Sequence, residues 1–448
     1  MIRALIAGAL AATGLIQAPP PVTGWLTFGN DPGRSSATAR SVAGPPGVRW
    51  AIKLPGRITS QPLVVRGAPG TGRATVYAAT SAGAVYAVSD TGRVLWHVQL
   101  GKLAHDCQQL DGYGVTGTPV VDRSTRSLYA ADALGALHAL ALDTGKERPG
   151  WPVRLYSDFH DELVWGALAD VRGSIYAGTG SYCDEPMVGK TIRVDLSTRA
   201  VSRWISVPAE RGGGGGIWGW GGLAYSASRG SLLAVTGNAF HGGSNDGDKF
   251  REWVAYGEHL IELAPNLRLR GSSHPKDVHG TNDFDFVGSP VLATRPGCSE
   301  LAVALNKNGR LYAWRTAHVA GGPAWSLRLS PADPRRPLIS QPAYSPSLRA
   351  LFVVTGRGLV KIELTPKCKG KIAWTRRLGA INSTPTVAGD AVWVVAWHTN
   401  AVLLGIDART GAVRSRRELG RDRYLVGPTI VDGRIYLGSF AGLLRALG

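Results

Sequence analysis

The feature that most constrains this chain is a unit that recurs along almost its whole length. Each copy begins with a small residue, often followed by proline, and a hydrophobic pair. A tyrosine-centred strand, a glycine turn and a second strand follow, and often an Asp-Thr-Gly turn with a tryptophan-bearing strand. The copies start near Pro62, Pro119, Gly166, Gly222, Pro290, Pro342, Pro385 and Pro428. Internal repeats of this length are typical of solenoids and propellers.

Each unit contains four short alternating or apolar runs separated by Gly, Asp or Ser, which is the pattern of an up-and-down four-stranded sheet. One such sheet cannot bury both of its faces, whereas radial stacking around an axis buries them and leaves short edges. The sequence therefore predicts an all-β fold, an eight-bladed β-propeller of four-stranded antiparallel blades. The last unit lacks its fourth strand, and residues 48–54 have the form of that strand. We expect the N- and C-terminal strands to pair and close the ring.

The first residues have the pattern of an export signal. Arg3 supplies a positive start, residues 4–16 form a short apolar core, and Ala18 is a small residue for cleavage. We expect a signal peptide at 1–18, an N-terminal extension at 19–47 and a single propeller at 48–448; an uncleaved anchor is the alternative. No cysteine ends the apolar core, so we expect a secreted or cell-envelope protein that is not a lipoprotein.

Four cysteines are present, an even number in a compartment where disulfides persist. We favour the pairs Cys107 with Cys183 and Cys298 with Cys368, because each pair would join neighbouring blades; four unpaired buried thiols are the alternative. The absence of C-x-x-C spacing argues against a metal site, and the absence of C-x-x-C-H removes a built-in c-type haem.

The formal net charge is +18, which favours acidic partners such as wall polymers, anionic lipid surfaces or nucleic acid. The basic residues are nevertheless scattered through turns and strand ends, and no basic stripe interleaved with aromatic residues is present. We therefore interpret the charge as a solvated basic surface, and we expect a monomer with no nucleic-acid partner.

These repeats resemble those of the quinoprotein-like propeller superfamily, and the resemblance covers nearly everything after the signal. It is specific for the fold. It does not decide the function, because the superfamily includes both pyrroloquinoline-quinone (PQQ) dehydrogenases and non-enzymatic assembly scaffolds of the bacterial envelope.

A second resemblance lies in the middle units, where Gly214-Gly215-Gly216-Ile217-Trp218 is followed by Thr236-Gly237-Asn238. It is similar to the part of PQQ alcohol dehydrogenases in which a tryptophan lies under the quinone and an asparagine binds calcium. On this match Trp218 is the stacking floor and Asn238 a Ca²⁺ ligand, roles that suit an indole face and an amide oxygen. The alternative is that Trp218 belongs to a blade core and Asn238 caps a turn.

Two further matches follow downstream. Asp283 and Asp285 lie in an Asp-rich aromatic motif that, in those dehydrogenases, supplies the catalytic base. Which residue takes that role is left open, since the simplest alignment of the motif's aromatic residue with Phe284 places Asn282 or Asp283 there. Lys307 resembles a basic residue that contacts the quinone oxygens, where a cation favours the reduced cofactor. The alternatives are a solvated acidic loop and an exposed lysine beside an Asn308-Gly309 hairpin turn.

Two departures from the family pattern leave the function open. The family's Ca²⁺-binding glutamate has no clean counterpart, although Asp184 and Glu185 lie close to the required place, and the adjacent cysteine pair of many members is absent. The first hypothesis is a PQQ- and Ca²⁺-dependent dehydrogenase that oxidises an alcohol or sugar-type substrate and passes electrons to an external acceptor. The alternative is a non-catalytic envelope propeller that binds protein or wall-polymer partners.

Overall fold

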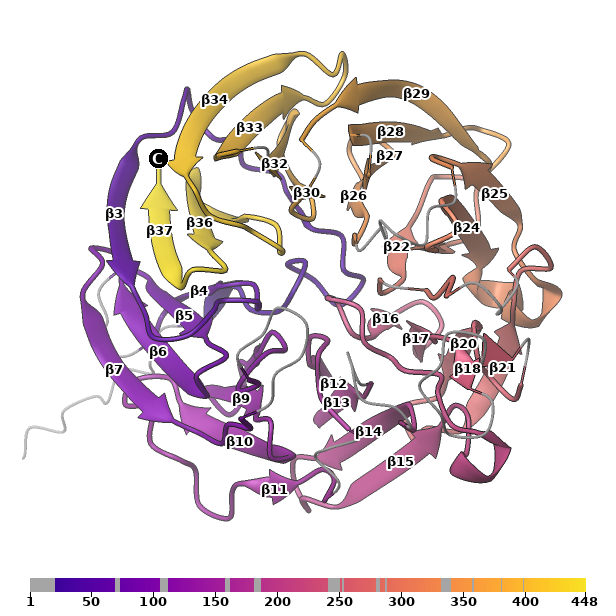
Figure 1. The fold of residues 1–448 in the computed structure, drawn as a ribbon, viewed down its shortest axis with the longest axis horizontal. Coiled ribbons are helices and arrows are strands. Elements are labelled where there is room, and N and C mark those ends of the chain that lie inside the picture. The colour runs from indigo at the N-terminus through magenta and orange to yellow at the C-terminus, as the bar shows by residue number, and fades with distance from the viewer. Residues whose placement is uncertain are drawn as a thin grey trace, which may run out of the picture.

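Figure 1 shows the chain, in a computed structural model, as a closed ring of small sheets around a central axis. The structure describes residues 21–68, 73–104, 112–157, 162–180, 187–240, 250–251, 254–278, 283–286, 288–331, 340–356, 358–379, 381–397 and 399–448. Within these residues, eight antiparallel sheets of at least four strands form the blades, with the first strand of each unit toward the axis. The predicted eight-bladed all-β propeller is confirmed.

The strand bounds follow the repeat closely. The first four blades contain β4 (Leu63–Arg66), β5 (Thr75–Ala79), β6 (Ala84–Ser89) and β7 (Val94–Gln99); β8 (Val120–Asp122), β9 (Ser127–Ala131), β10 (Ala136–Ala141) and β11 (Val153–Arg154); β12 (Ala169–Val171), β13 (Ser174–Gly178), β14 (Lys190–Asp195) and β15 (Val201–Ile205); and β16 (Ala224–Ser226), β17 (Ser231–Val235), β20 (Leu260–Leu263) and β21 (Leu269–Ser273). The last four contain β22 (Val291–Ala293), β23 (Leu301–Leu305), β24 (Arg310–Arg315) and β25 (Trp325–Arg328); β26 (Ala343–Ser345), β27 (Ala350–Thr355), β28 (Gly358–Leu364) and β29 (Gly370–Arg377); β31 (Thr386–Ala388), β32 (Ala391–Trp397), β33 (Ala401–Asp407) and β34 (Val413–Gly420); and β35 (Thr429–Val431), β36 (Arg434–Gly438) and β37 (Leu443–Leu447) with β3 (Val48–Lys53).

The ring closes by pairing the two ends of the chain. Strand β3 lies antiparallel to β37, with Trp50 opposite Ala446 and Lys53 opposite Leu443 (Figure 1). Strand β3 is therefore the outer strand of the eighth blade, as predicted from the absence of a fourth strand in the last repeat.

The tryptophan and the glycine turn of the repeat meet between blades. The indole nitrogen of Trp50 donates to the Asp90 carbonyl 3.0 Å away, and a Cβ on Gly92 would lie 2.9 Å from the Trp50 ring. Trp96 makes the same contact with the next blade, since its indole donates to the Leu142 carbonyl at 3.1 Å. The turn must therefore be glycine both for its positive φ and for the close approach of the neighbouring indole.

The N-terminal segment of residues 21–38 passes through the centre of the ring in Figure 1 and joins the innermost strands to one another. Its strand β1 (Thr23–Trp25) pairs with β4, and β2 (Ala37–Thr38) pairs with β31. Between them, carbonyls of this segment accept backbone hydrogen bonds from the second, fourth, fifth, sixth and seventh blades. Arg34 is fully buried there and donates to the carbonyls of Leu223, Leu168 and Phe28.

The remaining elements are small. They are β18 (Ala239–Phe240) with β19 (Phe250–Arg251), β30 (Ile381–Asn382), and the 3₁₀ helices at Ala209–Arg211 and Thr316–Gly321. Cys298 and Cys368 form a disulfide, as predicted, whereas Cys107 and Cys183 lie outside the described residues. No helix in the described part of the chain is both long and apolar enough to cross a membrane.

Candidate functional site

The predicted site residues are carried by loops that open at one end of the ring. In a four-stranded antiparallel blade, the loop after the second strand and the loop that leads to the next blade lie at the same end. Trp218 lies between β15 and β16, Asn238 follows β17, Asp283 and Asp285 lie between β21 and β22, and Lys307 follows β23. The topology thus brings together residues that are far apart in the sequence.

Lys307 is the centre of the resulting cluster. Its Nζ lies 2.8 Å from Asp283 Oδ1 and 2.8 Å from Asp285 Oδ2, and 5.3 Å from the centre of the Trp218 ring. Asn238 joins both carboxylates: its side-chain amide donates to Asp283 Oδ1 at 3.0 Å, and its backbone N–H donates to Asp285 Oδ1 at 2.5 Å. All five residues therefore belong to one network, which we call the Lys307 cluster.

The two carboxylates of the Lys307 cluster differ in how deeply they are buried. The Asp285 side chain is 12% exposed and the Lys307 side chain 8%, whereas Asp283 is 41% exposed. Asp285 is thus enclosed by its partners, and Asp283 faces solvent. This difference distinguishes the two predicted aspartates, whereas Asn282, the other residue considered for the base position, lies outside the described residues.

The electrostatics follow from that arrangement. Burial and the neighbouring carboxylate of Asp285 raise the pKa of Asp283 to about 6, although Lys307 opposes this shift. Burial alone would lower the pKa of Lys307, but Asp285 and Asp283 outweigh it and raise that pKa. Lys307 is therefore a fixed cation near neutral pH, and Asp283 can both hold and release a proton there.

The backbone holds the Lys307 cluster tightly. Asp283 has a positive φ of 53°, which is unfavourable for a residue with a side chain and is often found at functional sites. A Cβ on Gly237 would lie 2.8 Å from Asp285 Oδ1 and 3.2 Å from the Trp218 indole nitrogen. The hairpin turn expected at Gly309 is present, with φ at 82°, yet Lys307 beside it is buried rather than exposed.

The residues present suit a small hard cation. Asn238 Oδ1 is buried and accepts no hydrogen bond from the described residues. The nitrogens of the same residue bond to two carboxylates, and amide and carboxylate oxygens are the ligands that Ca²⁺ prefers. Asp184 and Glu185, predicted as further ligands, lie outside the described residues, and the described residues contain no group of three or more His, Cys, Asp or Glu side chains placed so that it could hold a metal ion.

Trp218 also belongs to an aromatic cluster that includes the N-terminal segment, and we call it the axial cluster. Its large members are Phe28, Tyr113, Trp165, Trp218 and Trp220, and Phe440 packs against it. Trp165 and Trp220 have ring centroids 5.6 Å apart. Phe28 was not predictable as a member of this cluster, because it lies outside every repeat. Trp218 is therefore both a core aromatic and a neighbour of the Lys307 ammonium, so the two interpretations made from sequence are compatible.

Comparison with known proteins agrees with the propeller fold. A family model described as "Outer membrane protein assembly factor BamB" matches residues 45–238 and 286–417. The chain belongs to this family. Its PQQ-repeat propeller is thus established by sequence as well as by structure, whereas a search of curated protein sequences gave no significant match.

Among solved structures, members of two functional groups share the fold. The quinohemoprotein alcohol dehydrogenase of Comamonas testosteroni superposes with a TM-score of 0.70 at 18% identity, over 95% of this chain and 80% of that one. A europium-containing methanol dehydrogenase gives 0.70 at 16%, over 94% and 91%. BamB from Moraxella catarrhalis gives 0.58 at 14%, over 90% and 99%. Identities this low establish a common fold and leave the activity to be argued from the site.

Proposed function

We propose that this protein is an exported quinoprotein dehydrogenase that binds PQQ and a cation at the Lys307 cluster and oxidises an alcohol or sugar-type substrate. The observation that carries the proposal is the convergence of five residues, chosen from sequence on four separate loops. Four of them are joined by hydrogen bonds, and the ring of the fifth, Trp218, lies beside the Lys307 ammonium. If these residues served only to hold the blades together, the buried Asn238 oxygen would not need to lack a hydrogen-bond donor. Nor would an aspartate that faces solvent be needed beside a buried lysine.

Each residue of the Lys307 cluster has a distinct role in this proposal. Asn238 Oδ1 and the buried Asp285 carboxylate are the cation ligands, and the indole of Trp218 is the floor for a planar ring. Lys307 stabilises negative charge that develops on a quinone oxygen. A bound quinone would supply the hydride acceptor for the reaction.

Asp283 is the proposed general base. Its side chain is the more exposed of the two aspartates, so a substrate hydroxyl can approach it. Its pKa of about 6 leaves it mostly ionised at neutral pH while it remains basic enough to accept a proton. Asp285, enclosed by Lys307 and the backbone of Asn238, is not open to the substrate hydroxyl and keeps its proposed role as a cation ligand.

The direct test combines binding and turnover. Thermal unfolding of the mature chain with Ca²⁺ should shift upward when PQQ is added, because a ligand at a hundredfold over its Kd adds about 2.7 kcal/mol of stability. Dye reduction with alcohols should require PQQ. Asp283→Asn should keep the binding shift and lose turnover, whereas Asn238→Ala should lose both.

The matched control is Asp277→Asn, a carboxylate in the same inter-blade loop that pairs with Arg310 and is outside the Lys307 cluster. It should leave cofactor binding and turnover unchanged. No thermal shift with PQQ under saturating conditions, with either Ca²⁺ or Eu³⁺, would refute the cofactor assignment.

The alternative is a non-catalytic envelope propeller that binds protein or wall-polymer partners. It is favoured by the family model that matches and by the likeness to BamB of Moraxella catarrhalis, nearly all of which this chain covers. In this case the Lys307 cluster would serve only the packing between blades. Pull-down of a specific envelope partner by a chain that never retains a quinone chromophore would support this alternative.

The proposed reaction implies a location and partners. A dehydrogenase of this kind needs an external electron acceptor, and the pattern of residues 1–18 favours export. We propose a monomer in the secreted or cell-envelope compartment. Mass spectrometry of the protein recovered from the extracytoplasmic fraction would test for removal of residues 1–18.

A further inference from the structure

A cavity of about 350 Å³ lies at the rim of the ring, between the fourth and fifth blades (Figure 1). On the fourth blade it is lined by strands β20 and β21 and by the turns at Arg229 and Arg268, and on the fifth blade by residues 317–320 of the 3₁₀ helix after β24. These turns join the first strand of a blade to the second, or the third to the fourth. They therefore lie at the end of the ring opposite the Lys307 cluster. We call this cavity the rim pocket.

One strand position without a side chain helps to keep the rim pocket open. Gly271 on β21 lies opposite Glu262 on β20. A Cβ on Gly271 would lie 3.5 Å from Val319 Cβ and 3.7 Å from the Ala320 nitrogen, which are ordinary van der Waals distances. The strand and the 3₁₀ helix are held at this separation by Ser273 Oγ, which donates to the Val319 carbonyl at 2.5 Å. Alanine would therefore fit at position 271, whereas a longer side chain would have to enter the pocket.

Arg270 is held in place on the wall of the rim pocket. Its Nη1 donates to the carbonyls of Arg229 and Gly230, 3.0 and 3.2 Å away. The same nitrogen donates to Ser231 Oγ at 2.6 Å. Its Nε and Nη2 groups have no hydrogen-bond partner within the described part of the chain. The guanidinium is thus oriented before a ligand arrives and keeps free N–H groups, which lowers the entropic cost of binding.

The charges around the rim pocket are mainly positive. Among the described residues that line it, three arginines face one carboxylate, that of Glu262. This carboxylate is 5% exposed, accepts a hydrogen bond from Ser231 Oγ at 2.7 Å and lies 3.7 Å from Arg229 Nη2. Arg268 is exposed, and its side chain contacts no polar group of the described residues. Arg268 and Arg270 are therefore two cations that no described carboxylate pairs with.

We propose that the rim pocket binds a doubly charged tetrahedral oxyanion, either inorganic phosphate or the phosphate group of a small monoester. The planar fork of an arginine pairs with two phosphate oxygens at once, and a phosphate has oxygens left for a second arginine. A phosphate monoester carries close to two negative charges at neutral pH, since its second pKa is about 6. The charge of the ligand thus matches that of the two cations.

The size of the rim pocket agrees with a ligand of this kind. Its volume is at the lower end of the range for small-molecule sites. The wall formed by Ala317 and Ala320 carries only methyl groups, so the carbon part of a monoester can lie against it. A phosphate group with a short organic chain would fill the space.

This site is separate from the proposed dehydrogenase site. No residue of the Lys307 cluster lines the rim pocket, and the two lie at opposite ends of the ring. Phosphate binding is therefore expected whether the propeller is an enzyme or a scaffold.

The test is calorimetric titration of the full mature chain with glycerol 3-phosphate, inorganic phosphate and glycerol in 0.15 M NaCl. At about this ionic strength the Debye length is about 8 Å, so salt screens general attraction to a basic surface. We expect one site per chain for a phosphate ligand and no binding of glycerol. Tighter binding of glycerol 3-phosphate than of inorganic phosphate would identify a monoester ligand, and equal or weaker binding would identify free phosphate.

Two kinds of variant test the site. Arg268→Gln and Arg270→Gln should each weaken phosphate binding at least tenfold, and Arg268→Gln should fold normally because that side chain has no partner to lose. Gly271→Leu should abolish binding by filling the pocket without changing any charge. Its matched control is Gly271→Ala, which should still bind, because its methyl group makes only ordinary contacts.

The control for general charge is Arg377→Gln, an exposed arginine on β29 that does not line the rim pocket. It should bind phosphate as the wild type does, and so should Lys307→Met. Absence of binding for both phosphate ligands at millimolar concentration would overturn the proposal. Equal weakening by Arg377→Gln and Arg268→Gln would also overturn it, because it would indicate attraction to the basic protein as a whole.

Discussion

Replacing Lys307 by methionine removes the positive charge that contacts both Asp283 and Asp285 while nearly keeping the side-chain volume. Lys307 and Asp285 are almost enclosed, and breaking a buried ion pair by removing one partner costs about 3–5 kcal/mol. The contact with the half-exposed Asp283 adds little, because solvent screens it. We therefore expect the free energy of unfolding to fall by about 3 kcal/mol at pH 7.5.

The loss should depend on pH in a definite direction. The folded-state pKa of Asp283, about 6, is above its ordinary value of 3.8, so the folded protein binds this proton more readily than the unfolded chain. Without Lys307 that pKa rises further, and protonation below pH 6 relieves the repulsion between the carboxylates. The destabilisation should thus be smaller at pH 5 than at pH 7.5.

Urea unfolding at the two pH values measures this effect, with the midpoint and slope giving the change in free energy. Ca²⁺ should restore part of the loss at pH 7.5, since a cation can take the charge that lysine supplied. Lys361→Met is the control: this lysine is equally buried but pairs with the half-exposed Glu363, so its loss should stay below about 1 kcal/mol. Equal stability of Lys307→Met and wild type at pH 7.5 would refute the electrostatic reasoning.

Three further predictions concern stability. Burial alone would lower the pKa of His138, but hydrogen bonds with two carboxylates raise it from 6.5 to about 9. The protonated imidazole therefore stabilises the fold by about 3 kcal/mol below pH 6.5, and this stabilisation is lost as the pH rises through 9. In urea unfolding, His138→Gln should lower the free energy of unfolding at about pH 6 and hardly change it at about pH 10. Arg34→Ala leaves several buried carbonyls without a donor and should lower the free energy of unfolding by about 3–5 kcal/mol. The urea midpoint of this variant should therefore lie below that of a variant in which a surface arginine is replaced by alanine. Reduction of the Cys298–Cys368 disulfide, which spans 70 residues, should cost about 4 kcal/mol, and a Cys298→Ala variant should show the same midpoint with and without reductant.

The architecture was predictable because the repeat encodes it locally. Each strand and each glycine turn has its own signal, and the incomplete last unit identified residues 48–54 as the closing strand. The central segment was not predictable in this way. Residues 21–38 bind the ring mainly through backbone hydrogen bonds, which require no periodic pattern of side chains. Arg34 is buried, but no neighbouring residue in the sequence distinguishes it from a surface arginine.

The sequence predicted which residues form the Lys307 cluster, but it did not predict the role of each one. A resemblance to known motifs located Asn238 and Lys307, yet Asp283 and Asp285 are two residues apart and chemically identical. Only the packing of the blades shows that one is enclosed and the other faces solvent. The spacing of residues in a loop carries no information about that difference, because burial is decided by elements far away in the sequence.

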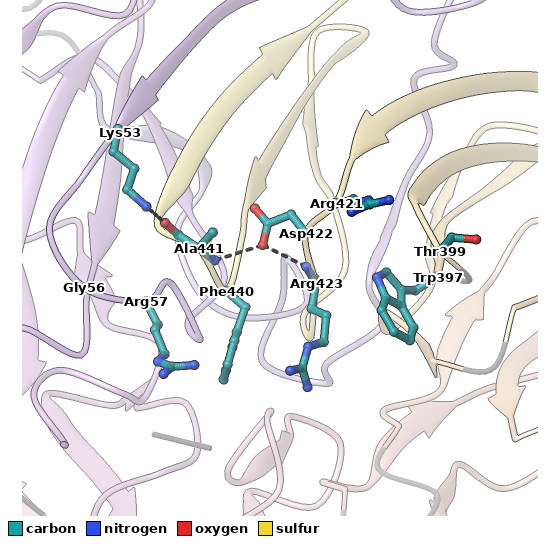
Figure 2. Close-up of a pocket in the computed structure, with 10 residues that line it drawn as sticks. All are labelled: Lys53, Gly56, Arg57, Trp397, Thr399, Arg421, Asp422, Arg423, Phe440 and Ala441. Atoms are coloured by element: carbon teal, nitrogen blue, oxygen red, sulfur yellow. Dashed lines mark hydrogen bonds between the residues drawn. The ribbon is translucent and has the colours of Figure 1, made fainter. Parts of the chain in front are cut away.

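The cavity at the closure of the ring, which Lys53, Arg57, Arg421 and Arg423 help to line, illustrates the same limit for charge (Figure 2). In the sequence, Lys53 and Arg57 follow one strand near the start, and Arg421 and Arg423 follow another near the end, so each pair resembles ordinary solvated turn residues. The pairing of β3 with β37 brings these loops to one cavity. Part of the basic surface that we interpreted as solvated is therefore concentrated at the closure of the ring. Because both walls of this cavity depend on that closure, neither turn by itself could have predicted it.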